Sequence, residues 1–151
     1  MVDQRRAGAR GADSGDVARA VEAAAILLGP RARSRGVRLE VECAAGLPAA
    51  ALGHDGLHQV LLNLALNAID ASPAGGSVRL AARAERGGLA LGVSDDGPGI
   101  ARTGRARSRP GGLGLAITRG ILEAADGSLA FARAPSGGTC ARVWLPATRP
   151  R

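Results

Sequence analysis

Four polar side chains in the segment 58–71 are spaced so that a helix would place them on one face. Gln59, Asn63 and Asn67 lie four residues apart, and Asp70 follows three residues later. At about 100° per residue they fall within roughly 80° of arc, on a helix whose other faces are mostly apolar. An amide oxygen is a neutral hard ligand suited to Mg²⁺, and an amide N–H can donate to phosphate. The same stripe is equally typical of a solvent-facing helix, or of amides that tie helix ends to loops.

A second candidate is the segment Asp95-Asp-Gly-Pro-Gly-Ile100, which directly follows a predicted strand. A carboxylate at a strand end can accept a hydrogen bond from an exocyclic amine such as that of adenine. Glycines after it let a ligand lie against bare backbone. Taken alone this is a weak signal, because a plain Gly/Pro turn has the same composition.

The third candidate is the segment 110–116, Pro-Gly-Gly-Leu-Gly-Leu-Ala, which reads as a glycine loop running into a helix. Backbone N–H groups at a helix N-terminus form a cradle for anions, although a hinge ahead of a helix has the same residues. Basic side chains between the second and third candidates could clamp phosphates or form a solvated charge run: Arg102, Arg105, Arg107 and Arg109.

The first half of the chain predicts two helices and a strand. One helix begins at the capping residue Asp16 and closes at Gly36, with Gly29-Pro30 expected to kink it or divide it in two. Residues 37–43 alternate apolar and polar, which predicts a strand with one wet face. Asp55 is a plausible cap for the next helix, which we expect to end near Ser72.

The second half predicts two hairpins on either side of a loop and a helix. Strands 78–83 and 89–93 flank a turn at Gly87-Gly88, and the segment 95–112 reads as a loop. A helix over 113–125 follows, with Gly127 as its stop. Strands 128–133 and 139–145 then form a hairpin across 135–138, where turn chemistry alone explains the glycines before Thr139.

This order excludes a doubly wound parallel sheet, because strands joined by hairpins are antiparallel. It predicts a two-layer α/β sandwich with one mixed, mostly antiparallel sheet of about five strands, covered by about three helices on one face. Residues 1–15 are interpreted as a flexible N-terminal segment or linker remnant, 16–146 as one domain, and 147–151 as a C-terminal tail.

The amino-acid composition argues against several classes of protein, among them nucleic-acid-binding and membrane-spanning proteins. All 20 basic residues are arginine, in part a sign of GC-rich coding, and the net charge is +7. Phe131 and Trp144 are too few aromatics for a nucleic-acid stacking platform, so we expect no nucleic-acid partner. No apolar run is long enough to span a membrane, and Cys43 and Cys140 cannot make a disulfide framework or a four-ligand zinc site. We therefore expect a cytoplasmic domain without direct membrane insertion.

The order of these segments resembles the ATP-binding domain of bacterial sensor histidine kinases, whose Bergerat-type fold is shared with gyrase B subunits and mismatch-repair ATPases. The segment 58–71, His-Gln-Val-Leu-Leu-Asn-Leu-Ala-Leu-Asn-Ala-Ile-Asp-Ala, looks like the family's N box. Residues 95–100 resemble its first glycine box, and 112–115, Gly-Leu-Gly-Leu, its second. The resemblance implies binding of ATP and Mg²⁺.

The resemblance also implies residue roles. Asn67 would coordinate Mg²⁺, with Asn63 beside it supporting metal or phosphate. Asp95 would accept the adenine amine, with Thr139 nearby. The other implied nucleotide contacts are Gly97 and Gly99 beneath the base, and Ile100, Arg109, Gly112, Leu113, Gly114 and Leu115 around the phosphates and lid.

The implied activity is phosphoryl transfer to protein. Gyrase-like ATPases have a water-activating glutamate where Asn63 stands, and an amide is no general base, which favours transfer over hydrolysis. The family's acceptor histidine sits on a dimerisation domain, whereas His54 and His58 lie at the start of the predicted second helix. The acceptor domain is therefore expected either to have been cut away from this chain or to lie on another chain, with a response regulator downstream.

A second departure concerns the lid between the glycine boxes. The segment 108–112, Ser-Arg-Pro-Gly-Gly, resembles the end of the family's lid with Arg109 in place of a lysine, but the Phe-rich box is missing. Two alternatives therefore stand beside a histidine kinase. One is a degenerate nucleotide-binding scaffold or phosphotransfer module, and the other is a stand-alone serine kinase of the anti-sigma type.

Overall fold

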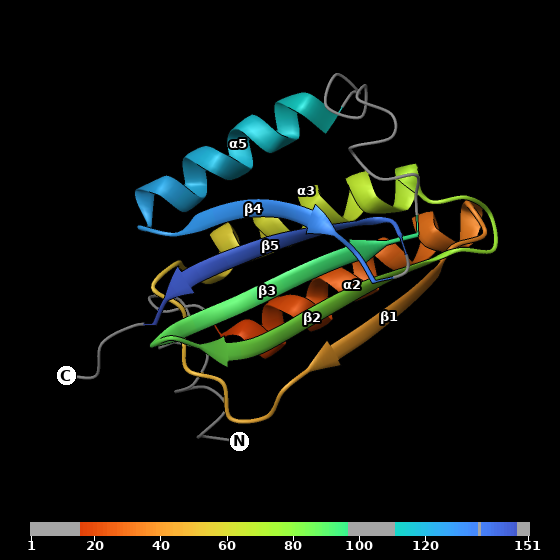
Figure 1. Ribbon diagram of the computed structural model, residues 1–151. Coiled ribbons are helices and arrows are strands. Elements are labelled where there is room, and N and C mark those ends of the chain that lie inside the picture. Colours follow the sequence, from red (N-terminus) through yellow and green to blue (C-terminus); the bar gives the residue numbers. More distant parts are fainter. Residues whose placement is uncertain (1–15, 97–110, 136, 148–151) are drawn as a thin grey trace.

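The computed structural model describes residues 16–96, 111–135 and 137–147 (Figure 1). Within these ranges the predicted sandwich is confirmed: one open sheet of five strands is covered by three helices on one face. No helix in this part of the chain is long and apolar enough to cross a membrane. The helices are α2 (Val17–Ser34), α3 (His54–Ala71) and α5 (Gly111–Ala124), and the strands are β1 (Arg38–Cys43), β2 (Ser77–Glu85), β3 (Gly88–Asp95), β4 (Ser128–Arg133) and β5 (Thr139–Pro146).

The strand order is β1-β2-β3-β5-β4, and the sheet is mixed and mostly antiparallel, as expected. Among the described strands, only the β1–β2 pair is parallel. The turn between β2 and β3 lies at Arg86-Gly87, one residue before the predicted Gly87-Gly88. Both turn residues have positive φ, 52° and 73°, which matches the primed two-residue turns of hairpins. Gly88 is instead a strand residue opposite Glu85, where an added methyl group would lie 2.8 Å from Cζ2 of Trp144.

The first helix begins as expected and is not divided. The Asp16 side chain accepts a hydrogen bond from Arg19 N at 3.2 Å. Pro30 lies inside the continuous helix, so of the two expected outcomes, a kink or a division, the division is wrong. Pro30 is exposed, and the carbonyl that loses its partner belongs to Ile26, whose side chain is 70% exposed, so water can replace that bond. The helix closes at Gly36, which has φ 69°.

The second helix, α3, begins two residues earlier than predicted. Its N-cap is Gly53 rather than Asp55, which lies in the first turn, where its negative charge faces the positive end of the helix dipole. The predicted end near Ser72 is confirmed, because Ser72 is the C-cap and its hydroxyl donates to Ala68 O at 2.9 Å.

The third helix, α5, starts two residues before the predicted Leu113, so Gly111 and Gly112 are helical rather than part of a loop. At its other end Gly127 N donates to Leu122 O at 2.7 Å. The residue with positive φ is Asp126, at 60°. Gly127 is needed for another reason, because a methyl group there would lie 2.7 Å from Trp144 O. The closing hairpin pairs β4 with β5 as predicted.

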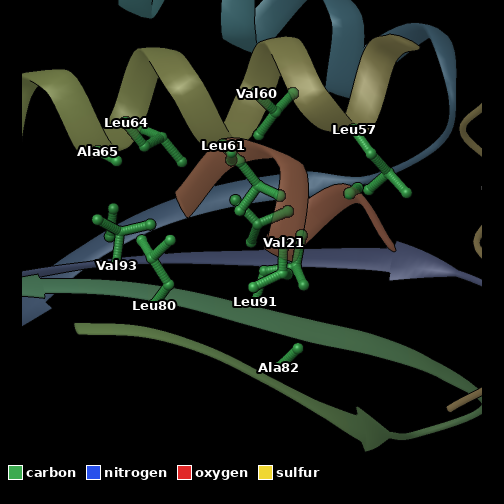
Figure 2. Close-up of a cluster of buried hydrophobic side chains, with 14 of the residues drawn as sticks. Val21, Leu57, Val60, Leu61, Leu64, Ala65, Leu80, Ala82, Leu91 and Val93 are labelled. Carbon is green, nitrogen blue, oxygen red and sulfur yellow. The ribbon is translucent and has the colours of Figure 1, made fainter. Parts of the chain in front are cut away.

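The core lies between α3 and the central strands. Figure 2 shows Leu61 and Leu64 of α3 facing Leu80, Leu91 and Val93 of β2 and β3. Full burial of each such side chain contributes about 1.5–3 kcal/mol relative to its exposure. The predicted apolar face of the first strand is only partly covered, because β1 is an edge strand: Val37 is 5% exposed but Val41 is 47% exposed.

Candidate functional site

Asp95 is the last residue of β3 and is one of the few buried polar side chains in the described ranges, with 7% exposure. Its Oδ1 accepts a hydrogen bond from the backbone N–H of Thr139, the first residue of β5, at 3.2 Å. The two strands are neighbours in the sheet, so the structure brings together two residues that lie 44 positions apart. A carboxylate held at a strand end in this way is a positioned hydrogen-bond acceptor.

Gly138 makes this contact possible. A methyl group at Gly138 would lie 2.7 Å from the carbonyl carbon of Asp95 and 2.8 Å from its Oδ1, distances that real side chains do not adopt. Turn chemistry therefore explains only Gly137, which has φ 100°. Our interpretation of both glycines as turn residues is wrong for Gly138, because its small size is required by the approach of Asp95.

The adjacent carboxylate, Asp96, has a different task. Its Oδ2 accepts from Ser77 N at 2.9 Å and from Ser77 Oγ at 3.1 Å. These bonds fix the start of β2 to the end of β3, directly after the buried Asp95. This pair was not predicted from the sequence, although the signal was present. A turn at Arg86-Gly87 sets the β2–β3 register, which places Ser77 opposite Asp96.

Asn63 links the two predicted phosphate-binding segments. Its Nδ2 donates to Gly114 O at 3.3 Å and to Thr118 Oγ1 at 3.2 Å, so one amide of α3 holds the beginning of α5. Gln59 Nε2 lies 3.5 Å from Asn63 Oδ1. Asn63 therefore ties the middle of helix α3 to the start of helix α5, rather than a helix end to a loop. Thr118 was not expected from the sequence.

The rest of the polar stripe divides between two environments. Asn67 is half-buried, and its side chain has no hydrogen-bond partner among the residues that the structure describes. Asp70 turns to α2, where its Oδ1 accepts from Arg31 Nη2 at 2.9 Å and its backbone O accepts from Arg35 Nη2 at 3.0 Å. The four residues thus do not form one site, because the side chain at the end of the helix is drawn to the arginines of its neighbour.

The predicted anion cradle lies in the first turn of α5. Gly112, Leu113 and Gly114 are helical, and the N–H groups of a helix's first turn have no acceptors within the helix. A methyl group at Gly114 would be in ordinary contact with Asn63, 3.6 Å from its Cγ. The described protein atoms alone therefore do not require glycine at this position. Leu115 is half-buried against the core.

These parts lie at one end of the molecule. Figure 1 shows the end of β3, the start of β5, the C-terminal half of α3 and the first turn of α5 at the same end. Four predicted site residues, Gly97, Gly99, Ile100 and Arg109, lie outside the described residues, as do Arg102, Arg105 and Arg107.

Two groups away from the candidate site, Cys43 and Glu85, have shifted pKa values. Burial, and then the nearby charge of Asp16, raise the pKa of the Cys43 thiol. A hydrogen bond from Arg83 lowers the pKa of Glu85 at the β2–β3 hairpin. The candidate site offers a buried carboxylate acceptor, amide side chains and the backbone N–H groups of a helix's first turn, which have no acceptors within the helix. That combination can bind an amine and an anion, but amide side chains cannot remove a proton from water.

These groups lie on a two-layer α/β sandwich, and comparison with known families identifies the family to which such a chain belongs. Residues 53–149 match the family model described as "Histidine kinase-, DNA gyrase B-, and HSP90-like ATPase". The chain belongs to this family, as the order of its motifs indicated. The described ranges contain no group of three or more His, Cys, Asp or Glu side chains that could hold a metal ion.

Several of the relatives that the chain matches are sensor histidine kinases. It is 33% identical over 129 residues to the sensor histidine kinase ZraS of Escherichia coli, a match that covers 80% of this chain and 28% of ZraS. The full-length structure of ShkA in complex with AMPPNP superposes with a TM-score of 0.77 at 28% identity, covering 91% of this chain and 32% of that one. The mycobacterial sensor histidine kinase MprB gives 0.69 at 28% identity, with coverages of 90% and 97%. The chain thus spans under a third of ZraS.

Proposed function

We propose that this chain is the ATP-binding catalytic domain of a two-component sensor histidine kinase. It would bind Mg·ATP and donate the γ-phosphoryl group to a histidine on a dimerisation domain that is not among its described residues. The observation that carries the proposal is the buried carboxylate of Asp95, held by Thr139 N at 3.2 Å at the end of β3. Membership of the ATPase family and the likeness to a structure that holds an ATP analogue support it.

The adenine would lie at the end of β3. Asp95 would accept a hydrogen bond from its exocyclic amine, and Thr139 would line the same side. Gly97 and Gly99 would lie beneath the base. Selection for an amine follows from chemistry, because a carboxylate accepts from N–H but repels a carbonyl oxygen at the same position.

The phosphates would lie at the start of α5. Its first turn, Gly111–Gly114, would supply backbone N–H donors, and Ile100, Arg109, Leu113 and Leu115 would complete the enclosure. Asn67 fits a magnesium ligand, because it is half-buried and its amide has no partner in the described ranges. Mg²⁺ usually keeps several waters and bridges phosphates, so one amide from the protein is chemically sufficient. Bound there, it would neutralise phosphate charge.

The step favoured at this site is phosphoryl transfer to a protein side chain. An amide stands at Asn63, and both protons of its Nδ2 face acceptors on α5, so this side chain cannot act as a general base. The contribution of the chain is then to orient the nucleotide and hold its charge. A response regulator would receive the phosphoryl group after the histidine.

Calorimetry tests nucleotide binding first. We expect wild-type chain to bind Mg·ATP and ADP. Asp95→Asn should weaken both by about ten- to a hundredfold, the value of one charge-assisted hydrogen bond. Asn67→Ala should remove the dependence of ATP affinity on Mg²⁺ and leave ADP binding without Mg²⁺ unchanged. No binding at millimolar nucleotide would overturn the proposal and favour a scaffold.

A transfer assay tests the reaction. The chain is mixed with radiolabelled ATP and a histidine-containing dimerisation domain of a sensor kinase, and the product is treated with acid or base. Phosphohistidine is labile in acid and stable in base, so acid-labile label on that domain supports the proposal. Acid-stable label on a serine protein would indicate the anti-sigma type of kinase. Tight ATP binding without any transfer would indicate the degenerate nucleotide-binding scaffold.

A further inference from the structure

Thr118 is a buried polar residue for which the proposed site has no assigned role. It lies on α5 with 0% exposure, and among the described residues only Ser72, Asp95 and Thr118 are buried and polar or charged. Its Oγ1 accepts a hydrogen bond from Nδ2 of Asn63 at 3.2 Å. A hydroxyl placed in a core at this position costs desolvation unless it is paired, so its partner indicates what it does.

The contacts determine the orientation of the Asn63 amide. Gly114 O, 3.3 Å away, is a carbonyl and can only accept a hydrogen bond, so the NH₂ end must face α5. With Thr118 Oγ1 as the second acceptor, both protons of Nδ2 have partners. The Oδ1 atom is thereby turned away from α5, and its one described contact is Gln59 Nε2 at the long distance of 3.5 Å.

We propose that Thr118 is a positioning residue of the nucleotide site. It holds the Asn63 amide with Oδ1 directed away from α5, free to accept from a ligand donor or cation, and clamps the first turn of α5 to α3. This inference rests on the proposed function, since the turn it holds is the proposed phosphate cradle. Thr118 would not touch the nucleotide and would act through Asn63 and Gly114.

The Thr118→Val variant distinguishes the effect of the hydroxyl group from the effect of side-chain packing. Valine has nearly the same shape and fits an apolar surrounding, but it removes the second acceptor of Asn63. Thr118→Ser keeps the acceptor and loses only a methyl group. The matched control is Ile117→Val on the same helix, because Ile117 is 43% exposed and no described contact joins it to Asn63.

Heteronuclear NMR of the whole chain reads the amide directly. The sequence has two asparagines and two glutamines, Asn63, Asn67, Gln4 and Gln59, so its spectrum contains four side-chain NH₂ pairs. We expect Thr118→Val to move the Asn63 pair and increase its exchange with water, with little change at Asn67. Thr118→Ser and Ile117→Val should leave the Asn63 pair near its wild-type position.

Calorimetry with Mg·ATP gives the functional readout. Thr118→Val should weaken binding about three- to tenfold, the usual value of one neutral hydrogen bond, and Thr118→Ser should restore it. Wild-type affinity together with an unmoved Asn63 pair in Thr118→Val would overturn the positioning role. Equal weakening in the valine and serine variants would overturn it too, since keeping the hydroxyl would then make no difference to binding. Absence of nucleotide binding by the wild type would overturn the proposed function itself. Failure of the positioning role alone leaves wild-type nucleotide binding intact, so the two failures are distinguishable.

Discussion

The buried carboxylate of Asp95 and the backbone N–H of Thr139 are joined at 3.2 Å across two neighbouring strands. This bond fixes Oδ1 of the carboxylate at the end of β3. It is a backbone contact, so substitution of Thr139 would not remove the donor. The side chain of Asp95 is accordingly the part of the pair that can be tested by mutation.

Asp95 should select for the amine of the base. We expect wild-type chain to bind ATP more tightly than inosine triphosphate, which carries a carbonyl where ATP has the amine. In Asp95→Asn this preference should fall by about tenfold or more, because the amide can present its NH₂ to that carbonyl. Competition binding with both nucleotides measures the ratio. An unchanged preference in the variant would show that Asp95 does not contact the base.

Gly138 and Gly137 should respond differently to alanine. Gly138→Ala places a methyl group against the Asp95 backbone, so it should lower both the free energy of unfolding and ATP affinity. A methyl group at Gly137 would meet open space. The only cost of Gly137→Ala is the backbone strain at φ 100°, about 1–2 kcal/mol. Denaturant unfolding and calorimetry on both variants make the comparison. Equal losses of ATP affinity would contradict a specific role for Gly138.

Asp96 should affect the free energy of unfolding more than it affects ATP binding. Asp96→Ala removes the acceptor for Ser77 N and Oγ, and we expect a loss of about 1–3 kcal/mol in the free energy of unfolding. Ser77→Ala removes only the hydroxyl bond and should cost less. Urea unfolding of the two variants, with ATP binding measured under folded conditions, checks the order. A larger effect of Ser77→Ala than of Asp96→Ala would refute the arrangement.

Asp70 should have no role in nucleotide binding. Its pairs with Arg31 and Arg35 are about half exposed, so Asp70→Asn should cost no more than about 1 kcal/mol, and less at high salt. ATP affinity should stay at the wild-type value, in contrast with Asn67→Ala on the same helix. A tenfold loss of ATP affinity in Asp70→Asn would contradict this prediction and show that Asp70 belongs to the nucleotide site.

The Cys43 thiol gives a pH dependence of known sign. Because burial raises its pKa, the folded chain holds this proton more tightly than the unfolded chain. Its contribution to stability is complete below the ordinary thiol range, near pH 8.5, and is lost as pH rises through that range to the folded pKa. The free energy of unfolding should therefore fall less steeply between about pH 8 and 10 in Cys43→Ala than in the wild type. Equal slopes would contradict the shift.

Local patterns were sufficient for most elements because their causes are local. The Asp16 cap, the glycines at positive φ and the alternation in 78–83 and 89–93 each act within a few residues, so helices, hairpins and the sandwich followed from them. The errors arose where a distant contact overrides the local preference. Pro30 stays inside a helix because the buried face of α2 continues past it, and Val41 is exposed because β1 lies at the sheet edge.

The sequence by itself determined the class of the protein, because amides four residues apart and glycines around Asp95 and Gly114 are recognisable from residue type and spacing alone. Tertiary structure decided which hydrogen-bond partner each of several adjacent or evenly spaced residues contacts. It turned Asp95 toward Thr139 and Asp96 toward Ser77, and it drew Asp70 away to the arginines of α2. Such divisions depend on which atoms of distant segments come within about 3 Å, the range of a hydrogen bond, and that distance exists only once the sheet and helices have packed.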